Sequence, residues 1–211
     1  MLSIILIVVL GYLIGSFPTS IITGKILRGI DIREHGSGNA GATNVFRVLG
    51  WKPGIFVMAF DIFKGFAVTF WISRIAIDMV PLNLELMQII AGCAAIFGHI
   101  WTIFANFHGG KGVGTAAGML IALYPLALLI CLGIFIIVFL LSRIVSLSSI
   151  SAAISLPIVL TIFRYGINKP VPLSLYLFGF FASALIIYTH RSNIKRLLNG
   201  TENRFDRKKP A

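Results

Sequence analysis

Long hydrophobic runs, separated by short polar segments, dominate the chain. A helix needs about 20 apolar residues to cross the hydrocarbon core of a bilayer, and the longest runs reach that length. The runs lie at residues 2–24, 54–73, 84–107, 113–124, 126–141, 148–163 and 173–189. This pattern predicts an all-α fold, a polytopic membrane protein with seven transmembrane helices in a single domain spanning 1–211.

The composition indicates the same class of protein. Of the 211 residues, 57% are hydrophobic and only 18 Lys or Arg and 7 Asp or Glu are charged, whereas roughly a quarter of a soluble domain is charged. Cys93 and Cys131 lie in hydrophobic runs, which offers neither a disulfide framework nor a zinc-ligand cluster. The first run ends in TSIITGK without a small-residue cleavage site, so we expect a retained span and not a signal peptide.

The basic residues predict how the chain crosses the membrane. The stretch 113–141 is long for one crossing and short for two, and Pro125 divides it. With two crossings there and the N-terminus outside, 14 of the 18 basic residues fall in the cytosolic segments 25–52, 108–112, 142–147 and the tail from 190. A single crossing leaves 9 outside against 8 inside. Basic residues favour the cytosolic side, so we predict seven spans with a cytosolic C-terminus. The net charge of +11 then reflects topology, and no nucleic-acid partner is expected.

The first unusual polar segment is DIREHGSGNAGATNVFRVLG, residues 31–50. Its glycines alternate with short polar side chains, which allows the backbone to turn several N–H groups toward one anion. A helix beginning near Ala42 adds its positive end and places Arg47 one turn further on. The alternative is a flexible turn between two spans. A dinucleotide-binding fold is excluded because no strand precedes the glycines.

The second segment is HGGKGVGTAAG, residues 108–118, in which glycines surround Lys111. A glycine-rich loop that runs into a helix start is typical of a phosphate cradle, with the lysine as a point charge. It is not a Walker A loop, because Ala105 and Gly112 stand where that motif needs Gly and Ser or Thr. The alternative is a tight helical hairpin whose glycines allow close packing.

Two further polar segments lie near the C-terminal end. In HRSNIKRLLNGTENR, residues 190–204, His190 and Asn193 are three apart and share one helix face. His190 titrates near neutral pH, whereas the surrounding basic residues are those of any cytosolic tail beside anionic lipid. We expect the tail at about 206–211 to be disordered and to bind such lipid. The segment SRIVSLSS, residues 142–149, is a serine-rich cytosolic turn.

Three ionisable residues lie inside the predicted spans. Asp61 and Lys64 stand three apart on the second run, and His99 lies on the third. Charges inside a membrane are costly and commonly functional, but a self-neutralising pair also serves as a structural clip. We expect His99 to orient the loop that follows it.

The polar residues of these segments limit the kinds of reaction that the protein could catalyse. Two glycine-rich anion loops on one face predict two phosphate-bearing ligands. The cytosolic carboxylates are not clustered as a Mg²⁺ site requires, so no metal and no cofactor is expected. The H-x-x-x-x-D motif of many glycerolipid acyltransferases is also missing after each histidine. An enzyme built from these residues therefore needs a donor that is already activated.

Three strings carry a family resemblance: GSGNAGATNVFR, GHIWTIFANFHGGKGVGT and HRSNIKRLLNGTEN. They resemble the three cytosolic motifs of the bacterial acyl-phosphate:glycerol-3-phosphate acyltransferases, and the D-x-x-K-G beginning at Asp61 matches as well. Two departures are minor: Gly114 stands where the family often has Ala, and Thr102 where Pro is common. The resemblance implies transfer of a fatty acyl group from acyl phosphate to the 1-position of glycerol 3-phosphate. It implies lysophosphatidic acid and phosphate as products, and a multi-pass protein of the bacterial inner membrane with a cytosolic active site.

The resemblance also implies roles for individual residues. Lys111 and the amides of Gly109, Gly110 and Gly112 would hold the acyl-phosphate headgroup. The catalytic set would be Ser37, Arg47, Lys111, His190 and Asn193. Further substrate contacts would come from Gly38, Asn39, Gly41, Asn44, Ser146 and Ser148. Structural roles would fall to Glu202, which would hold the tail in place, and to Asp61, Lys64 and His99.

Two questions stay open at this point. His190 is either the general base for the acceptor hydroxyl or an orienting group, with the substrate phosphate taking the proton; we favour the second. A small anion carrier is the main rival function, although few polar residues lie near the midplane as a carrier needs; an alcohol phosphotransferase is disfavoured by the shortage of carboxylates. The enzymatic hypothesis requires Arg47, Lys111 and His190 to meet in one pocket on the inner leaflet. The sequence leaves the oligomeric state open.

Overall fold

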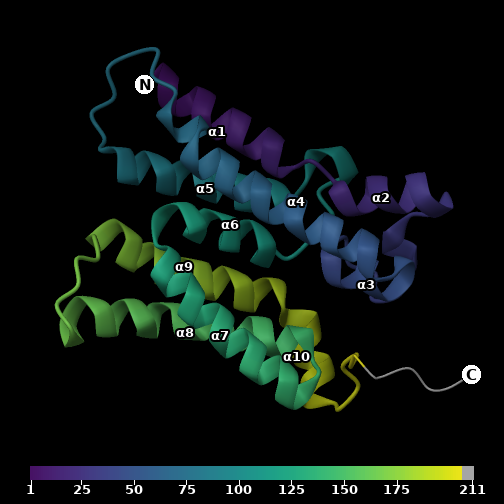
Figure 1. The fold of residues 1–211 in the computed structure, drawn as a ribbon. Helices are drawn as coiled ribbons and strands as arrows, with labels where there is room; N and C mark the ends of the chain where they lie inside the picture. Colours follow the sequence, from purple (N-terminus) through teal and green to yellow (C-terminus); the bar gives the residue numbers. More distant parts are fainter. Residues whose placement is uncertain (206–211) are drawn as a thin grey trace, which may run out of the picture. The chain divides into compact units, whose positions relative to one another are not determined.

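The computed structural model describes residues 1–205, and within them every regular element is a helix (Figure 1). The all-α prediction is therefore confirmed for this part of the chain, while the expectation for the tail at 206–211 lies outside the described residues. The α-helices are α1 (Leu2–Gly15), α2 (Thr19–Arg28), α3 (Ala42–Leu49), α4 (Trp51–Phe70), α5 (Leu84–Ile100), α6 (Val113–Leu123), α7 (Pro125–Ser142), α8 (Val145–Thr161), α9 (Leu173–Thr189) and α10 (Arg191–Leu198). Short helical turns are η1 (Ile32–Glu34), η2 (Ile72–Arg74), η3 (Ile103–Ala105) and the π-helical η4 (Ile162–Gly166).

Five helical segments within residues 1–205 are long and apolar enough to cross a membrane. The bent pair α9 and α10, which meet at 61°, adds a sixth if it is counted as one span. Helix α6 has 11 residues, about 16 Å at 1.5 Å per residue, which is short for a full crossing. The fold is an all-helical membrane fold, and the seventh crossing and the orientation stay predictions.

The predicted division at Pro125 is confirmed. Helix α6 ends at Leu123 and α7 begins at Pro125, because proline lacks the N–H that a helix interior needs but is well suited to a first helical position. Among the described residues, the same point separates two compact units, 1–124 and 125–205. The first unit carries both glycine-rich loops, and the second carries the serine turn and the polar C-terminal segment.

In the first unit, α1 packs along α5, and α4 packs along α6 (Figure 1). An apolar cluster that includes Ile7, Val68 and Ala91 joins α1, α4 and α5. Where α4 and α6 meet, a Cβ added to Gly65 would overlap the backbone of Thr115. Small residues of this kind let membrane helices approach closely. This close approach fixes the start of α6, and therefore the loop that precedes it.

The predicted run 2–24 lies within one candidate span, Leu2–Arg28, which is broken into two helices. Helix α1 ends at Gly15 and α2 begins at Thr19, with Pro18 between them. Proline cannot donate the helical hydrogen bond, so the helix breaks at this point. The Phe17 carbonyl next to the break accepts a hydrogen bond from Lys64 Nζ at 3.2 Å. The buried lysine therefore satisfies a backbone group that the break exposes.

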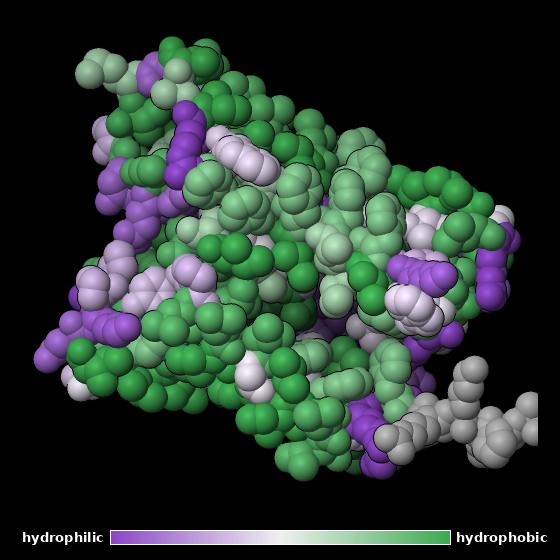
Figure 2. Space-filling view, viewed as in Figure 1, coloured by the Kyte–Doolittle hydropathy of each residue, from purple (hydrophilic) through white to green (hydrophobic). Residues whose placement is uncertain are grey.

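In the second unit, α8 packs between α7 and α9. Helix α7 leaves most of its apolar side chains exposed; Leu129, Leu140 and Leu141 are 62%, 70% and 83% exposed. Most of the surface that faces the viewer in Figure 2 is hydrophobic, with hydrophilic residues gathered in patches. An exposed apolar surface of this extent suits contact with lipid.

Candidate active site

The first glycine-rich loop is organised by one buried side chain, Asn44. Its Nδ2 atom donates to the carbonyls of Ile32 at 2.8 Å and His35 at 2.9 Å, and its Oδ1 atom accepts from the Ser37 amide at 2.8 Å. Asn44 is 0% exposed. Its amide group is fully buried and bonded within the loop, and a contact between Asn44 and substrate stays a prediction. Its role is to hold the backbone at Ser37.

The other predicted residues of this loop lie around that clamp. Gly36 and Gly38 have positive φ angles of 63° and 72°, a conformation that glycine adopts without strain. A Cβ on Gly36 would also overlap the Asn44 side chain. Ser37 and Asn39 are half-buried, and Gly38 is exposed.

The predicted helix near Ala42 is confirmed as α3, with Gly41 preceding it. No side chain caps this end, and the first amides of a helix lack intrahelical partners, so the N-terminus of α3 favours an anion. Arg47 lies four residues after Thr43 and therefore on the same helix face. It is half-buried on α3, which places a fixed positive charge beside the first loop.

The second glycine-rich loop is organised by its backbone. The Gly109 amide donates to the Ile100 carbonyl and the Gly110 amide donates to the His99 carbonyl, each at 3.0 Å. The loop thus folds back onto the end of α5. Both amides therefore donate inside the loop in this structure, and their contact with a headgroup stays a prediction. A Cβ on Gly110 would overlap the His99 ring, so only glycine fits against the imidazole.

Lys111 follows directly after this closed turn and is half-buried. Gly112 then takes a left-handed conformation, φ 84°, and α6 begins at Val113 without a side-chain cap. The first amides of α6 have no intrahelical acceptor. Lys111 therefore lies two residues before the positive end of α6, and together the two favour an anionic group.

The three buried ionisable residues form one cluster beneath the second loop. Lys64 Nζ lies 2.9 Å from Asp61 Oδ1, and His99 Nδ1 lies 3.5 Å from the same oxygen. All three are less than 10% exposed. The opposite charges of Asp61 and Lys64 satisfy each other, as a structural clip requires. The cluster joins α4 to α5, and His99 extends it to Gly110.

A hollow of about 220 Å³, which includes space open to the outside, lies beside this cluster. Its lining includes Lys64, His99, Gly109 and the break between α1 and α2. Two lining hydroxyls, Ser16 Oγ and Thr19 Oγ1, are buried and lack a hydrogen-bond partner within residues 1–205. The lining is therefore polar and suits small polar molecules such as water.

Glu202 is the centre of the polar cluster in the second unit. Its carboxylate accepts hydrogen bonds from Ser146 Oγ at 2.8 Å, Asn193 Nδ2 at 2.7 Å and Arg196 Nε at 2.7 Å. Burial alone raises the pKa of Glu202, but the hydrogen bonds from Asn193, Ser146 and Arg196 together hold that pKa below its ordinary value. Glu202 therefore stays ionised and ties the segment after α10 to α8.

The two serines predicted to bind a substrate phosphate are used inside the unit. The Ser146 hydroxyl donates to Glu202, and the Ser148 hydroxyl donates to the Ile144 carbonyl at 2.9 Å. Ser148 is 0% exposed. A hydroxyl has one proton to donate, and each of these protons already has an acceptor. Both hydroxyls are bonded inside the unit in this structure, and a contact of Ser146 and Ser148 with substrate phosphate stays a prediction.

His190 stands at the bend between α9 and α10. Its Nδ1 atom lies 2.8 Å from the Ile186 carbonyl, and the side chain is 3% exposed. Because a carbonyl only accepts, we assign the ring proton to Nδ1, and in the neutral ring Nε2 then carries the lone pair. Asn193 lies on the next turn, as the spacing predicts, and is 5% exposed. The bend thus holds both side chains in defined orientations.

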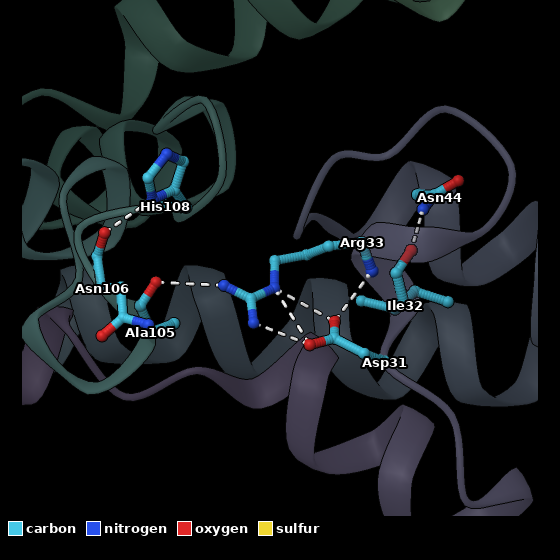
Figure 3. A network of polar contacts seen from close by, with 7 residues as sticks. All are labelled: Asp31, Ile32, Arg33, Asn44, Ala105, Asn106 and His108. Carbon is cyan, nitrogen blue, oxygen red and sulfur yellow. Dashed lines mark hydrogen bonds and ion pairs between the residues drawn. The ribbon is translucent and has the colours of Figure 1, made fainter.

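The structure brings together some of the predicted site residues. In the first unit, a polar network links the loop of Ser37 and Asn44 to the loop of Lys111 (Figure 3). In the second unit, Glu202 gathers Asn193 and Ser146. Arg47 and Lys111 belong to the first unit and His190 to the second, and their meeting in one pocket stays a prediction.

Sequence reasoning missed the ion pairs of two arginines. Arg33 pairs with Asp31 at 2.7 Å, and Arg196 pairs with Glu202 at 2.7 Å. The hydrogen bond from Arg33 lowers the pKa of Asp31 to about 2. The D-x-R spacing directly before the first glycine loop was a signal for the first pair. The second joins residues six apart across the end of α10, and a short sequence pattern contains no sign of it.

A family model and sequence relatives both match this chain, and they carry the same family name. The family model described as glycerol-3-phosphate acyltransferase matches residues 5–200. A glycerol-3-phosphate acyltransferase of Chlorobium phaeobacteroides (strain BS1) is 46% identical over 228 aligned positions, and one of Chlorobaculum tepidum is 47% identical over 225. Each alignment covers 97% of this chain and 97% of the relative.

Two solved structures are also similar. They are crystal structures of PlsY (YgiH), an integral membrane glycerol 3-phosphate acyltransferase, in a glycerol 3-phosphate form and a lysophosphatidic acid form. The TM-scores are 0.84 and 0.82, at 38% identity, over 97% of this chain and 96% of the other. The resemblance seen in the three motifs thus extends over almost the whole chain and to its fold. The chain belongs to the glycerol-3-phosphate acyltransferase family, a family of membrane-bound enzymes.

Proposed function

We propose that this protein transfers a fatty acyl group from acyl phosphate to the 1-position hydroxyl of glycerol 3-phosphate. The products are lysophosphatidic acid and inorganic phosphate, and the reaction begins phospholipid synthesis. The observation that carries the proposal is the family membership over nearly the full chain. The solved relatives, described in forms with glycerol 3-phosphate and lysophosphatidic acid, support the acceptor and the product.

The proposed reaction balances without a cofactor. The 1-hydroxyl oxygen attacks the acyl carbonyl carbon, the bond from that carbon to the phosphate oxygen breaks, and the hydroxyl proton passes to the departing phosphate. An acyl phosphate is a mixed anhydride with a good leaving group, so the enzyme needs little covalent chemistry. Its main tasks are to align the two substrates and to neutralise phosphate charge.

The residues of the first unit fit those tasks. We assign the acyl-phosphate headgroup to Lys111 and the N-terminus of α6, with Gly112 providing the turn. The first loop, through Ser37, Gly38, Asn39, Gly41 and Arg47, contributes to the phosphate and acceptor pocket. Gly109 and Gly110 shape the second loop, and Asn44 holds the first. A lysine on one loop and an arginine beside the other suit two phosphate-bearing substrates, because each loop then supplies one fixed cation.

In the second unit we assign His190 and Asn193 to orienting the acceptor, and the departing phosphate to accepting the proton. The contact between His190 Nδ1 and the Ile186 carbonyl supports an orienting role. It fixes the imidazole ring, so that Nε2 can accept a hydrogen bond from the acceptor hydroxyl in one orientation. The test is the pH–rate profile of His190→Gln. An unchanged profile with a modest loss of rate supports orientation, whereas loss of the basic limb assigns His190 as the general base.

The membrane arrangement is part of the proposal. We propose seven spans, the N-terminus outside, and the active site on the cytosolic face of the bacterial inner membrane. Cysteine labelling tests this in a C93A/C131A background. A cysteine at Met79, which is 97% exposed, should react with a membrane-impermeant maleimide in intact cells. A cysteine at Asn199 should react only after lysis, and the reverse result would overturn the orientation.

A direct assay tests the reaction. Purified protein is given synthetic palmitoyl phosphate and labelled glycerol 3-phosphate, without coenzyme A or added metal. We expect labelled lysophosphatidic acid with palmitoyl phosphate and none with palmitoyl-coenzyme A. Formation of product from the thioester alone would overturn the choice of donor, and no product from either would overturn the proposed function.

A further inference from the structure

A polar network in the first unit joins the two glycine-rich loops (Figure 3). Its central residues are Asp31 and Arg33, which lie just before the first loop, and the Ala105 carbonyl, which lies just before the second. The link therefore connects the start of the first loop to the chain that leads into the second.

The geometry at Arg33 uses the whole guanidinium fork. Nε and Nη2 donate to the Asp31 carboxylate, with the closest contacts at 3.0 and 2.7 Å. Nη1 points the other way and donates to the Ala105 carbonyl at 3.0 Å (Figure 3). Asp31 also accepts from the Arg33 backbone amide at 3.0 Å. The carboxylate therefore fixes the orientation of the fork, which reaches across to the chain after α5.

The far end of the network is the base of the second loop. The Ala105 carbonyl that accepts from Arg33 also accepts from the His108 amide at 3.1 Å. His108 immediately precedes Gly109, Gly110 and Lys111. Arg33 thus contacts the same oxygen that begins the turn leading to Lys111.

The near end of the network is the clamp of the first loop. Asn44 binds the carbonyl of Ile32, which lies between Asp31 and Arg33, and also binds the Ser37 amide. Ile32 is 0% exposed and belongs to the same apolar cluster as Ala105 and Val45. An unbroken series of contacts therefore runs from Ser37 through Asn44 and Arg33 to the Lys111 loop.

We propose that Arg33 is a positioning residue for the acyl-transfer reaction, with Asp31 as its orienting partner, and that the pair sets the distance between the two phosphate-binding loops. This inference rests on the proposed function. If each loop holds one substrate, then the spacing of the loops decides whether the acceptor hydroxyl meets the acyl carbon. Small errors in such alignment reduce the rate strongly. Lysine cannot substitute, because a single ammonium cannot bind the carboxylate in a fork and reach Ala105.

The experiment compares Arg33→Gln and Arg33→Lys with a matched control, Arg28→Gln, which removes an exposed charge from the same region. Rates are measured with palmitoyl phosphate and glycerol 3-phosphate and are normalised to the folded fraction. We expect kcat/KM to fall about 10- to 100-fold in R33Q, with no rescue in R33K and little change in R28Q. Wild-type kcat/KM in R33Q, or full rescue by R33K, would overturn the proposal.

A second measurement separates positioning from general stability. If Arg33 acts by placing the Lys111 loop, then R33Q should cause less than about a threefold further loss in a K111Q background, because coupled residues are non-additive. A loss equal to that in the wild-type background would overturn the proposal. If R33Q does not fold, D31N gives the same comparison with a smaller expected loss, since Arg33 keeps its bond to Ala105.

Failure of the proposed function can be distinguished from failure of the positioning role of Arg33. A wild-type protein that makes no lysophosphatidic acid from acyl phosphate counts against the chemistry and leaves a binding test for the network. Calorimetric titration with glycerol 3-phosphate needs no donor, and R33Q should bind it several-fold more weakly than R28Q. Equal affinity of the two variants would overturn the positioning role.

Discussion

The two glycine-rich loops of the first unit have similar compositions but are held in different ways. The first is held by side chains: Asn44 clamps its turn, and Asp31 with Arg33 ties down its start. The second is held by main-chain bonds from Gly109 and Gly110 to the end of α5. In the second loop we therefore assign anion binding to the charge of Lys111 and the N-terminus of α6, and not to the amides of Gly109 and Gly110. A glycine-rich sequence alone does not reveal which of these two designs a loop uses.

The largest expected effect tests that conclusion in the second loop. Lys111→Ala should lower kcat/KM about 10²- to 10³-fold, because it removes the fixed charge aimed at a phosphate. The measurement is the steady-state rate with palmitoyl phosphate, alongside a thermal melt. The melting temperature should change little, since Lys111 is half-buried at the surface of the loop. Activity close to that of the wild type would mean that backbone amides bind the headgroup after all.

A change at Gly110 tests the main-chain design. Gly110→Ala places a methyl group against the His99 ring, and overpacking of this kind costs about 1–3 kcal/mol. We expect lower stability together with lower activity. Gly114→Ala is the control, because its Cβ would lie 3.4 Å from the nearest heavy atom, an ordinary contact. Equal stability of the two variants would contradict the close packing on His99.

A change at Asn44 tests the side-chain design. Asn44→Ala leaves two carbonyls and one amide without their partner, and we expect a loss of about 3 kcal/mol of unfolding free energy. Asn199→Ala, at an exposed position, should change stability little. Denaturant or thermal unfolding in detergent measures both. A stable N44A variant with weakened glycerol 3-phosphate binding would restore Asn44 as a substrate contact.

The smallest effect is the pH dependence of the first loop. Asp31 has a pKa of about 2 in the folded protein against an ordinary 3.8. Its contribution to stability is therefore present above about pH 4 and is lost as the pH falls toward 2. For this partly exposed pair we expect about 1–2 kcal/mol. Melting temperatures of wild type and D31N should converge between pH 4 and pH 2, and a constant difference would refute the assignment.

The sequence predicted the helical fold well because membrane helices depend on long apolar runs. The run 173–189 coincides with α9, and the boundary at Pro125 is where two helices meet. The break between α1 and α2 was missed, because residues 2–24 are hydrophobic enough to read as one span. The Phe17 carbonyl at that break is satisfied by Lys64 from another helix, and no local pattern contains that contact.

The sequence predicted where the candidate site lies more reliably than it predicted the role of each residue in it. Glycine, lysine and asparagine identified both loops, and the helix at Ala42 followed from its position. Asn44, Gly109 and Ser148 were assigned to substrate, but their polar groups bond within the protein. A short motif shows which donors exist but not which are already used, because that depends on distant partners.

The closed second loop has a consequence for inhibitor design. A compound that aims hydrogen-bond acceptors at the amides of Gly109 and Gly110 would compete with the carbonyls of Ile100 and His99 and gain little affinity. An anionic group directed at Lys111 would instead meet a cationic side chain beside the N-terminus of α6. Inhibitor design should therefore first place a negative charge near Lys111. Gly109 and Gly110 should be treated as a surface for shape complementarity and not as hydrogen-bond donors.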